Sequence, residues 1–259
     1  MNQFFNQERF AQLVLKHWAD NKKRYTLSLL AYVGLLFTWL LFWLIVEGIP
    51  SRNGLPGEMQ YSTFYFSLFA FGTFYASQYF SDLGSKERGS DFLLVPASTF
   101  EKLLCSLFFT VLLFPLLIIG AFYLVDVLMV TLSNSFVADS TLLKSTVVNV
   151  FGVDLLRFNP NQAIKLFLFF FSIESLFLLG SVYFKKYNFI KTIITGFVIV
   201  LLFFLFVYIM AEHVLPERDD DYYFSKIEKW FPTFLQVLAY SIAPLAWVGT
   251  YFILKAKQV

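Results

Sequence analysis

The residues of this chain that are suited to bind a charged or polar partner gather in one short segment, residues 81–102, which reads SDLGSKERGSDFLLVPASTFEK. The rest of the chain is mostly apolar and aromatic. Within the segment a charged group precedes an apolar group, an order typical of a contact surface in which a polar rim surrounds apolar anchors. The rim residues are Lys86, Glu87 and Arg88, and the anchors are Phe92, Leu93 and Leu94. We expect this surface to dock onto a partner protein, the alternative being that it lies on lipid headgroups.

The end of the same segment has the spacing of a helix start. Ser98 and Glu101 fit the S-x-x-E pattern of a capping box, in which two side chains satisfy free backbone N–H groups in the first turn of a helix. Pro96, just ahead of them, stops a helix that arrives from upstream. The pattern therefore predicts a stiff joint between the docking surface and the helix that follows.

One further residue stands out by its position. Glu174 lies about midway along an apolar run, where an ionised carboxylate costs several kcal/mol. Its side chain must therefore be partnered, protonated or in contact with water. Two interpretations stay open: a hydrogen-bonded carboxyl with a structural role in a helix interface, or a group on a substrate or proton path.

Several chemistries that an enzyme needs are missing. The sequence has no G-x-x-x-x-G-K-[ST] phosphate-binding loop, so any energy from ATP has to come from a partner. The histidines His17 and His213 fall on opposite sides of the membrane in the topology derived below and cannot share a metal. The acidic run at 219–221 lacks the ligand spacing of a calcium loop, and Cys105 is expected to pack in the interior. We expect no catalysis, no metal and no cofactor in this chain.

The composition is that of a membrane protein. Of the 259 residues, 58% are hydrophobic and 21% aromatic, and the mean hydropathy is +0.65. Apolar runs of about 20 residues are long enough to cross a bilayer as helices. We predict an all-α polytopic membrane protein, a single transmembrane domain over residues 1–259. The six predicted transmembrane helices are 25–46, 61–80, 103–130, 163–184, 189–211 and 233–254.

Local patterns add detail to this frame. Apolar residues recur with helical spacing in the first turns of the chain, which predicts an amphipathic helix at 5–20 in the lipid interface. Gly72 and Ala76 in the second span predict close helix packing. Pro115 predicts a kink in the third span. The connection 131–162 is more polar, too short for an independent domain and long enough for one or two interfacial helices.

The basic residues set the orientation. Most of the 20 Lys and Arg residues fall on the side of the chain that carries both termini and the segment 81–102. Because cytoplasmic loops are enriched in Lys and Arg, we expect both termini to be cytoplasmic. The net charge of +2 gives no indication of nucleic-acid binding. The basic residues on this side are Arg9, Lys16, Lys22, Lys23, Arg24, Lys86, Arg88, Lys102, Lys185, Lys186, Lys191, Lys255 and Lys257.

Taken with the interfacial helix and the six spans, the phrase VPASTFEK at 95–102 resembles the L-P-A-S-x-x-E-K-like phrase of the membrane subunits of type-2 ATP-binding cassette (ABC) exporters, with Val95 in place of the usual Leu. The acidic and aromatic connection 212–232 is similar to the external re-entrant region of that family. The resemblance covers nearly the whole chain in architecture and a short phrase in sequence.

This resemblance implies a function. In such exporters the loop between spans two and three is a coupling helix that docks in a groove of a cytosolic ATPase, and two permease subunits pair around the transport path. The resemblance implies that this chain is a permease in the bacterial inner membrane, surrounded by membrane lipids. It implies two protein partners: a cytosolic ABC ATPase, which holds ATP and magnesium, and a second permease subunit, either identical to this chain or different from it. The alternatives are a non-transporting scaffold or sensor of an envelope complex and, third, a proton-coupled transporter that uses Glu174.

Overall fold

The computed structural model describes residues 4–51, 54–136, 144–151, 160–213 and 220–257. At residues 51, 86–88, 160–162, 210–213 and 220–235 the description is limited to the backbone. The described chain is all helical and has no strand, which confirms the predicted fold class in its main feature. In order, the elements are α1 (Gln7–Trp43), η1 (Leu44–Gly48), α2 (Ile49–Ser51), α3 (Gly57–Tyr79), η2 (Ser81–Gly84), α4 (Lys86–Leu94), α5 (Thr99–Leu107), η3 (Phe108–Leu113), α6 (Phe114–Phe136), α7 (Pro160–Tyr183), α8 (Asn188–His213) and α9 (Asp220–Lys257).

Every predicted span corresponds to a helix, and the starts differ most at the first and the last: α1 begins at Gln7 and so joins the predicted interfacial helix 5–20 to the first span in one helix. α9 begins at Asp220, well ahead of the predicted start at 233, so the end of the connection 212–232 is helical. Five stretches of the described chain are long and apolar enough to cross a membrane, as expected of a multi-pass membrane protein. They are Gln7–Gly48, Thr99–Phe136, Ala163–Tyr183, Asn188–Ile209 and Gln236–Lys257. The sixth span, which corresponds to α3, stays a prediction, as does the side of the membrane on which the termini lie.

The contacts group the chain into two compact units. Unit 1 comprises Met1–Gly72 and Pro96–Phe170, and unit 2 comprises Thr73–Val95 and Phe171–Val259. Helices α3 and α7 contribute residues to both units, because the boundary falls inside each of them. The single transmembrane domain over 1–259 stays a prediction.

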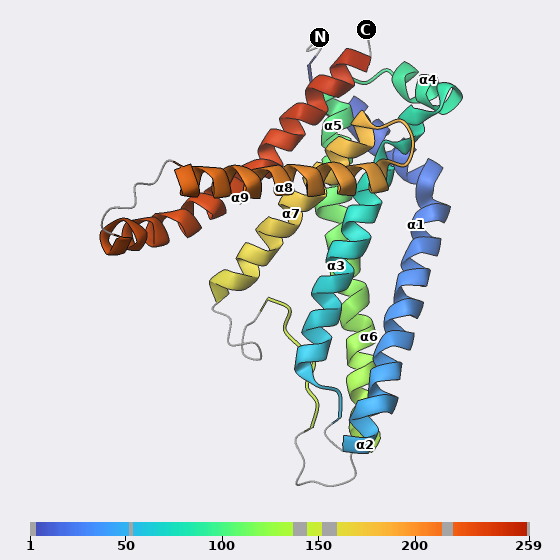
Figure 1. Ribbon diagram of the computed structural model, residues 1–259. Helices are drawn as coiled ribbons and strands as arrows, with labels where there is room; N and C mark the ends of the chain where they lie inside the picture. Colours follow the sequence, from blue (N-terminus) through green and yellow to red (C-terminus); the bar gives the residue numbers. More distant parts are fainter. Residues whose placement is uncertain (1–3, 52–53, 137–143, 152–159, 214–219, 258–259) are drawn as a thin grey trace. The chain divides into compact units, whose positions relative to one another are not determined.

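Unit 1 is built on helices α1, α3 and α6, which run side by side (Figure 1). α1 buries one stripe of residues spaced four apart, Tyr32, Leu36 and Leu40, and leaves its other faces largely exposed. The Tyr32 hydroxyl lies 3.0 Å from the Ser67 hydroxyl on α3. A stripe of this spacing lies along one side of a helix, so α1 presents one face to the unit and the rest to its surroundings.

Helix α3 is the packed helix that its small residues predicted. A Cβ added at Gly72 would lie 2.5 Å from the Phe170 ring of α7, so only glycine allows this approach. Small and polar residues let helices approach closely in lipid, where packing rather than the hydrophobic effect holds helices together. α3 is accordingly not among the five stretches of the described chain that are long and apolar enough to cross a membrane. The buried polar residues of α3 are Gln60, Thr63, Ser67, Thr73 and Ser77.

The described part of the connection between α6 and α7, residues 144–151, is not helical, so none of the interfacial helices for which the connection is long enough lies there. It lies along α3 and α6, whose side chains bond its backbone. The N–H of Val148 donates to Asp126 at 3.2 Å, and the N–H of Val150 donates to the Tyr123 hydroxyl at 3.1 Å. The Tyr61 hydroxyl donates to the carbonyl of Asn149 at 2.8 Å. Because helix side chains satisfy these backbone groups, the segment needs no helical hydrogen bonds of its own.

Pro115 predicted a kink in the third span, and the irregularity lies immediately before it. Helix α5 passes into the π-helical stretch η3 and then into α6 without a break. A wider turn of this kind is a common site of bending in a long helix. Phe109 in η3 is buried and contacts the rings of His17 and Tyr25 in α1.

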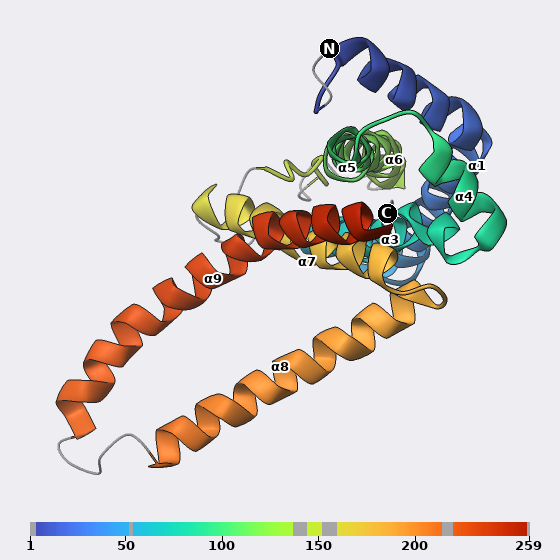
Figure 2. The same cartoon turned by 90° about the horizontal axis from the view of Figure 1, so that it is seen from above.

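Helix α1 bends near its N-terminal third. Figure 2 shows its first turns lying across the direction of the rest of the helix. His17 Nε2 lies 2.6 Å from the hydroxyl of Tyr25, a contact that spans the bend. The first turns thus have the orientation expected of a helix in the lipid interface, and their place in the membrane stays a prediction.

Unit 2 holds α4, α8, α9 and the second half of α7. Gly180 of α7 meets the side chain of Thr192 of α8, and Gly249 of α9 meets Leu179 of α7. The Lys257 ammonium donates to the carbonyl of Val182 at 2.6 Å and so ties the end of α9 to the end of α7. Beyond these contacts α8 and the first part of α9 lead away from α4 and α7 (Figures 1 and 2).

Helix α8 is apolar and exposed on all sides. No residue of its most apolar window is buried in this structure, and Phe197 and Phe204 are both 65% exposed. A helix that is hydrophobic all round is stable only when lipid or protein covers it. Its surface is therefore suited to the membrane interior.

Candidate functional site

The predicted docking segment, residues 81–102, consists of two short helices and a joint. η2 (Ser81–Gly84) and α4 (Lys86–Leu94) come first, and α5 begins at Thr99. The chain passes from unit 2 to unit 1 between Val95 and Pro96. Val95 has φ −58° and ψ 125°, the extended conformation that a following proline favours. The predicted stop ahead of Pro96 is confirmed, because α4 ends at Leu94.

The start of the segment is held against unit 2 by a glycine. Gly84 lies so close to the carbonyl oxygen of Lys185, in the turn between α7 and α8, that an added Cβ would overlap it. The backbone carbonyl has little freedom to move away, since it belongs to the turn. Glycine at position 84 thus fixes η2 on the α7–α8 turn.

The three predicted anchor residues have different surroundings. The Phe92 ring packs edge-on against the buried ring of Phe80, with 5.8 Å between centroids, and is half-buried. Leu93 is also half-buried, whereas Leu94 is 79% exposed. Leu94 is therefore the anchor most available to a partner. The predicted rim residues Lys86, Glu87 and Arg88 form the first turn of α4, and their side chains lie outside the described part.

The joint at the end of the segment is the capping box that the sequence predicted. The Ser98 side chain accepts from the N–H of Glu101 at 3.2 Å, and the Glu101 carboxylate accepts from the N–H of Ser98 at 2.8 Å. Ser98 has extended φ and ψ, as a residue at the N-cap requires. The first helical turn of α5 is thereby fixed from both sides.

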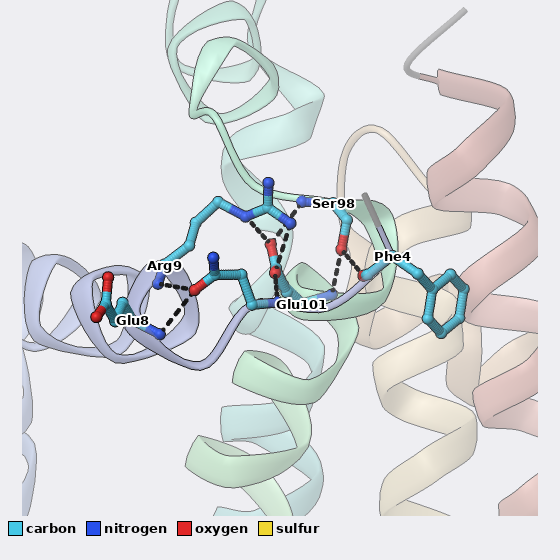
Figure 3. A network of polar contacts seen from close by, with 6 residues as sticks. Phe4, Glu8, Arg9, Ser98 and Glu101 are labelled. Atoms are coloured by element: carbon cyan, nitrogen blue, oxygen red, sulfur yellow. Dashed lines mark hydrogen bonds and ion pairs between the residues drawn. The ribbon is translucent and has the colours of Figure 1, made fainter. Parts of the chain in front are cut away.

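The Glu101 carboxylate also reaches the N-terminal helix, which the sequence did not predict (Figure 3). The Arg9 guanidinium donates to Oε2 through Nε and to Oε1 through a terminal nitrogen, each at 2.7 Å. The N–H of Asn6 donates to Oε1 at 2.8 Å. Together with the N–H of Ser98, four donors occupy the two carboxylate oxygens, which matches their full accepting capacity.

These bonds lie in a buried setting. The Glu101 side chain is fully buried, and the Arg9 side chain is 35% exposed. Charge-assisted hydrogen bonds in a two-point arrangement are among the strongest and most directional that proteins form. The arrangement therefore fixes the angle between the start of α1 and the start of α5.

The electrostatics of Glu101 follow from its donors. Glu101 lies in the first turn of the helix that starts at Thr99, ahead of the predicted span 103–130. Burial by itself would raise the pKa of the carboxyl, but the hydrogen bonds from Arg9, Ser98 and Asn6 and the Arg9 charge outweigh burial and hold the pKa below its ordinary value of 4.5. The group is therefore ionised at neutral pH.

The residues just before α1 close the joint from the other side. The Ser98 hydroxyl donates to the carbonyl of Phe4 at 2.7 Å, and the Phe4 ring stacks on Phe100 with 4.7 Å between centroids. Asn6 caps α1 by accepting from the N–H groups of Glu8 and Arg9 (Figure 3). We call the set Phe4, Asn6, Arg9, Ser98, Phe100 and Glu101 the N-terminal clamp.

Sequence reasoning missed half of the clamp. Asn6 followed by Gln7 and Glu8 is a recognisable helix start, but nothing in the spacing linked Arg9 to a carboxylate 92 residues later. In the sequence Arg9 is recognisable only as one basic residue of a predicted interfacial helix. A long-range ion pair has no local signal in a single sequence.

Glu174 lies apart from the clamp, in α7. It is 1% exposed, and neither carboxylate oxygen has a hydrogen-bond partner among the described residues. The interpretation of Glu174 as a hydrogen-bonded structural carboxyl is therefore not supported by the described part of the chain.

The remaining candidates are Cys105, His17, His213 and the acidic run at 219–221. Cys105 is buried, as expected. His17 pairs with Tyr25 inside α1. The side chains of His213 and of the acidic run at 219–221 lie outside the described part. Across the described ranges, no three His, Cys, Asp or Glu residues are grouped in a way that could hold a metal ion.

Comparison of the chain with protein-family models, with curated proteins and with solved structures gives no match.

Proposed function

We propose that this chain is the permease subunit of an ABC exporter in the bacterial inner membrane. Six spans with cytoplasmic termini form one half of a transport path, and a second permease subunit forms the other half. A cytosolic ABC ATPase binds α4 and its flanks, residues 81–102, and supplies ATP and magnesium. The substrate class that suits a path lined by apolar helices is an amphipathic or lipid-like molecule.

The observation that carries the proposal is the N-terminal clamp at the end of this segment. A docking helix transmits force only if its ends are attached to the helices that must move. Gly84 attaches the start of the segment to the α7–α8 turn in unit 2. Within unit 1, Glu101 attaches the end of the segment to α1 through Arg9. Both attachments support a coupling role for α4.

A second support is that this chain lacks an ATP-binding motif of its own and has an exposed apolar residue in its docking segment. The chain has no phosphate-binding loop, and its docking segment presents Leu94 with 79% of its surface exposed. An isolated leucine on a water-facing helix is stabilised when a partner covers it. A non-transporting scaffold or sensor has the same requirement for a partner, but the partner then hydrolyses no ATP.

The test is to purify the tagged full chain from its native membranes in mild detergent and to measure magnesium-dependent ATP hydrolysis in the eluate. We expect hydrolysis to co-elute with the wild type and to be lost with Leu94→Asp. Leu15→Asp is the matched control, because Leu15 is also an exposed leucine, 67% exposed on α1, and is not part of the docking segment. If the wild type yields no ATPase, the permease proposal fails in favour of a scaffold. If Leu94→Asp retains the ATPase as Leu15→Asp does, the docking role of α4 is wrong.

A further inference from the structure

Helix α7 carries an acidic side chain that is buried and has no hydrogen-bond donor among the described residues. Glu174 lies near the middle of the apolar stretch Ala163–Tyr183 and is 1% exposed. Neither carboxylate oxygen is bonded to a described residue. An ionised carboxylate in this setting costs several kcal/mol, since it has lost water and gained no donor.

The polar neighbours on the same helix are already engaged. The Ser175 hydroxyl donates to the carbonyl of Ser172 at 2.7 Å, and the Ser181 hydroxyl donates to the carbonyl of Leu178 at 2.6 Å. A serine hydroxyl has one hydrogen to donate. These hydroxyls therefore have none left for the carboxylate.

The charged groups around this half of α7 are also engaged or remote. Lys257 bonds the carbonyl of Val182, about 12 Å further along the helix axis at 1.5 Å per residue. Lys191 lies 5.9 Å from the centroid of the Phe184 ring, further along still. None forms an ion pair with Glu174 in the described part of the chain. Six charged residues with described side chains lie in η2, the α7–α8 turn, α8 and α9. They are Asp82, Lys185, Lys186, Lys191, Lys255 and Lys257.

A second buried acid in the apolar helices provides the contrast. Asp126 in α6 is fully buried, like Glu174, but it accepts from the N–H of Val148 at 3.2 Å. With its nitrogen turned toward Asp126, the Gln60 amide donates to both carboxylate oxygens, at 2.9 and 3.0 Å. Donors of this kind stabilise the charged form of a carboxyl. The two acids share burial and differ in their partners.

We propose that Glu174 is a proton-binding site in the membrane interior. In the described conformation the side chain is a neutral carboxylic acid that keeps its proton at neutral pH. When α7 is exposed to water the acid releases the proton to the solvent and becomes a carboxylate, so one proton leaves for each site that opens. A proton binds directly to a carboxylate oxygen, so this site requires no cavity. The inference does not depend on the proposed partnership with an ATPase.

The test uses a reagent that requires a protonated carboxyl in an apolar setting. Dicyclohexylcarbodiimide takes the acid proton on nitrogen while the carboxylate oxygen adds to its central carbon, and the adduct rearranges to a stable acylurea. The full chain in lipid vesicles at neutral pH is treated with this reagent, and the labelled peptides are quantified by mass spectrometry. We expect at least about tenfold more label on Glu174 than on Asp126, because the donors to Asp126 favour its charged form and Glu174 has no such donor among the described residues. A water-soluble carbodiimide is expected to leave Glu174 unlabelled.

Glu174→Gln keeps the size and hydrogen-bonding groups of the side chain and removes the titratable proton. Infrared spectroscopy of the wild type is expected to show a protonated carboxylic acid band that Glu174→Gln removes and Asp126→Asn leaves in place. The proposal is overturned if the wild type lacks this band, or if Glu174 and Asp126 are labelled equally. Labelling of Glu174 by the water-soluble reagent also overturns it, because the site is then open to water in its resting state.

Discussion

The Arg9 guanidinium donates two hydrogen bonds of 2.7 Å to the Glu101 carboxylate, across 92 residues of chain. This pair joins the first turn of α1 to the first turn of α5. Ser98 and Asn6 add their backbone N–H groups to the same carboxylate. The joint after α4 is therefore bonded to the start of α1 as well as to the start of α5.

The pair predicts non-additive effects on stability. Arg9→Ala and Glu101→Gln are each expected to lower the thermal stability of the full chain in detergent, and the double variant to lose less than the two losses summed. Arg9→Lys is expected to recover only part of the loss, since an ammonium cannot make the two-point contact of a guanidinium. Thermal unfolding of the four variants and the wild type measures this. Additive losses would show that Arg9 and Glu101 stabilise the chain independently.

The same carboxyl predicts a pH dependence. Because the pKa of Glu101 is lower in the folded chain than its ordinary value of 4.5, its stabilising effect is complete above that value and is lost as the pH falls through the lower, folded value. As the pH falls below 4.5, the wild type should therefore lose more thermal stability than Glu101→Gln. Parallel loss in the two proteins would mean that Glu101 is not held in the charged form.

Two serines at helix starts provide a matched comparison. Ser98 caps α5 through its side chain, whereas Ser85 occupies the N-cap of α4 without a side-chain capping bond. Ser98→Ala should cost about 1 kcal/mol of unfolding free energy. Ser85→Ala should cost clearly less, and denaturant unfolding compares them. Equal losses would contradict the capping role assigned to Ser98.

Two glycines provide another comparison. Gly84→Ala places a Cβ against the Lys185 carbonyl, whereas a Cβ at Gly120 in α6 has no atom within 4 Å. We expect Gly84→Ala to destabilise the protein by about 1–3 kcal/mol and to weaken co-elution of the ATPase. Gly120→Ala should leave stability unchanged or raise it by about 0.5–1 kcal/mol, because alanine favours a helix. If Gly84→Ala changes neither the stability nor the co-elution of the ATPase, the close contact of η2 with the α7–α8 turn is contradicted.

Local patterns predicted the helices and the joint well. The runs of apolar residues located every long helix, because about 20 such residues have one stable conformation in lipid. The S-x-x-E spacing located the start of α5 at Thr99, since a capping box acts within one helical turn. Gly72 predicted close packing and lies against the Phe170 ring.

What the sequence could not predict is long-range. The connection 144–151 has apolar residues that suggested a helix, but Asp126, Tyr61 and Tyr123 bond its backbone and hold it extended. Arg9 belongs to a clamp only because Glu101 lies beside it in space. Phe92 was grouped with Leu94 by type, yet its ring turns inward onto Phe80. Each case depends on a tertiary contact that has no sequence spacing.

The central claim is that α4 contacts an ATPase, and one measurement addresses it directly. The single cysteine, Cys105, is buried, so Leu94→Cys adds one exposed thiol to the chain. We expect a short thiol-reactive crosslinker in native membranes to join position 94 to a protein whose peptides include a G-x-x-x-x-G-K-[ST] loop. Leu15→Cys should give no such product. The proposed docking is contradicted if Leu94→Cys gives no crosslink to an ATPase. This holds whether Leu15→Cys gives such a crosslink or neither position does.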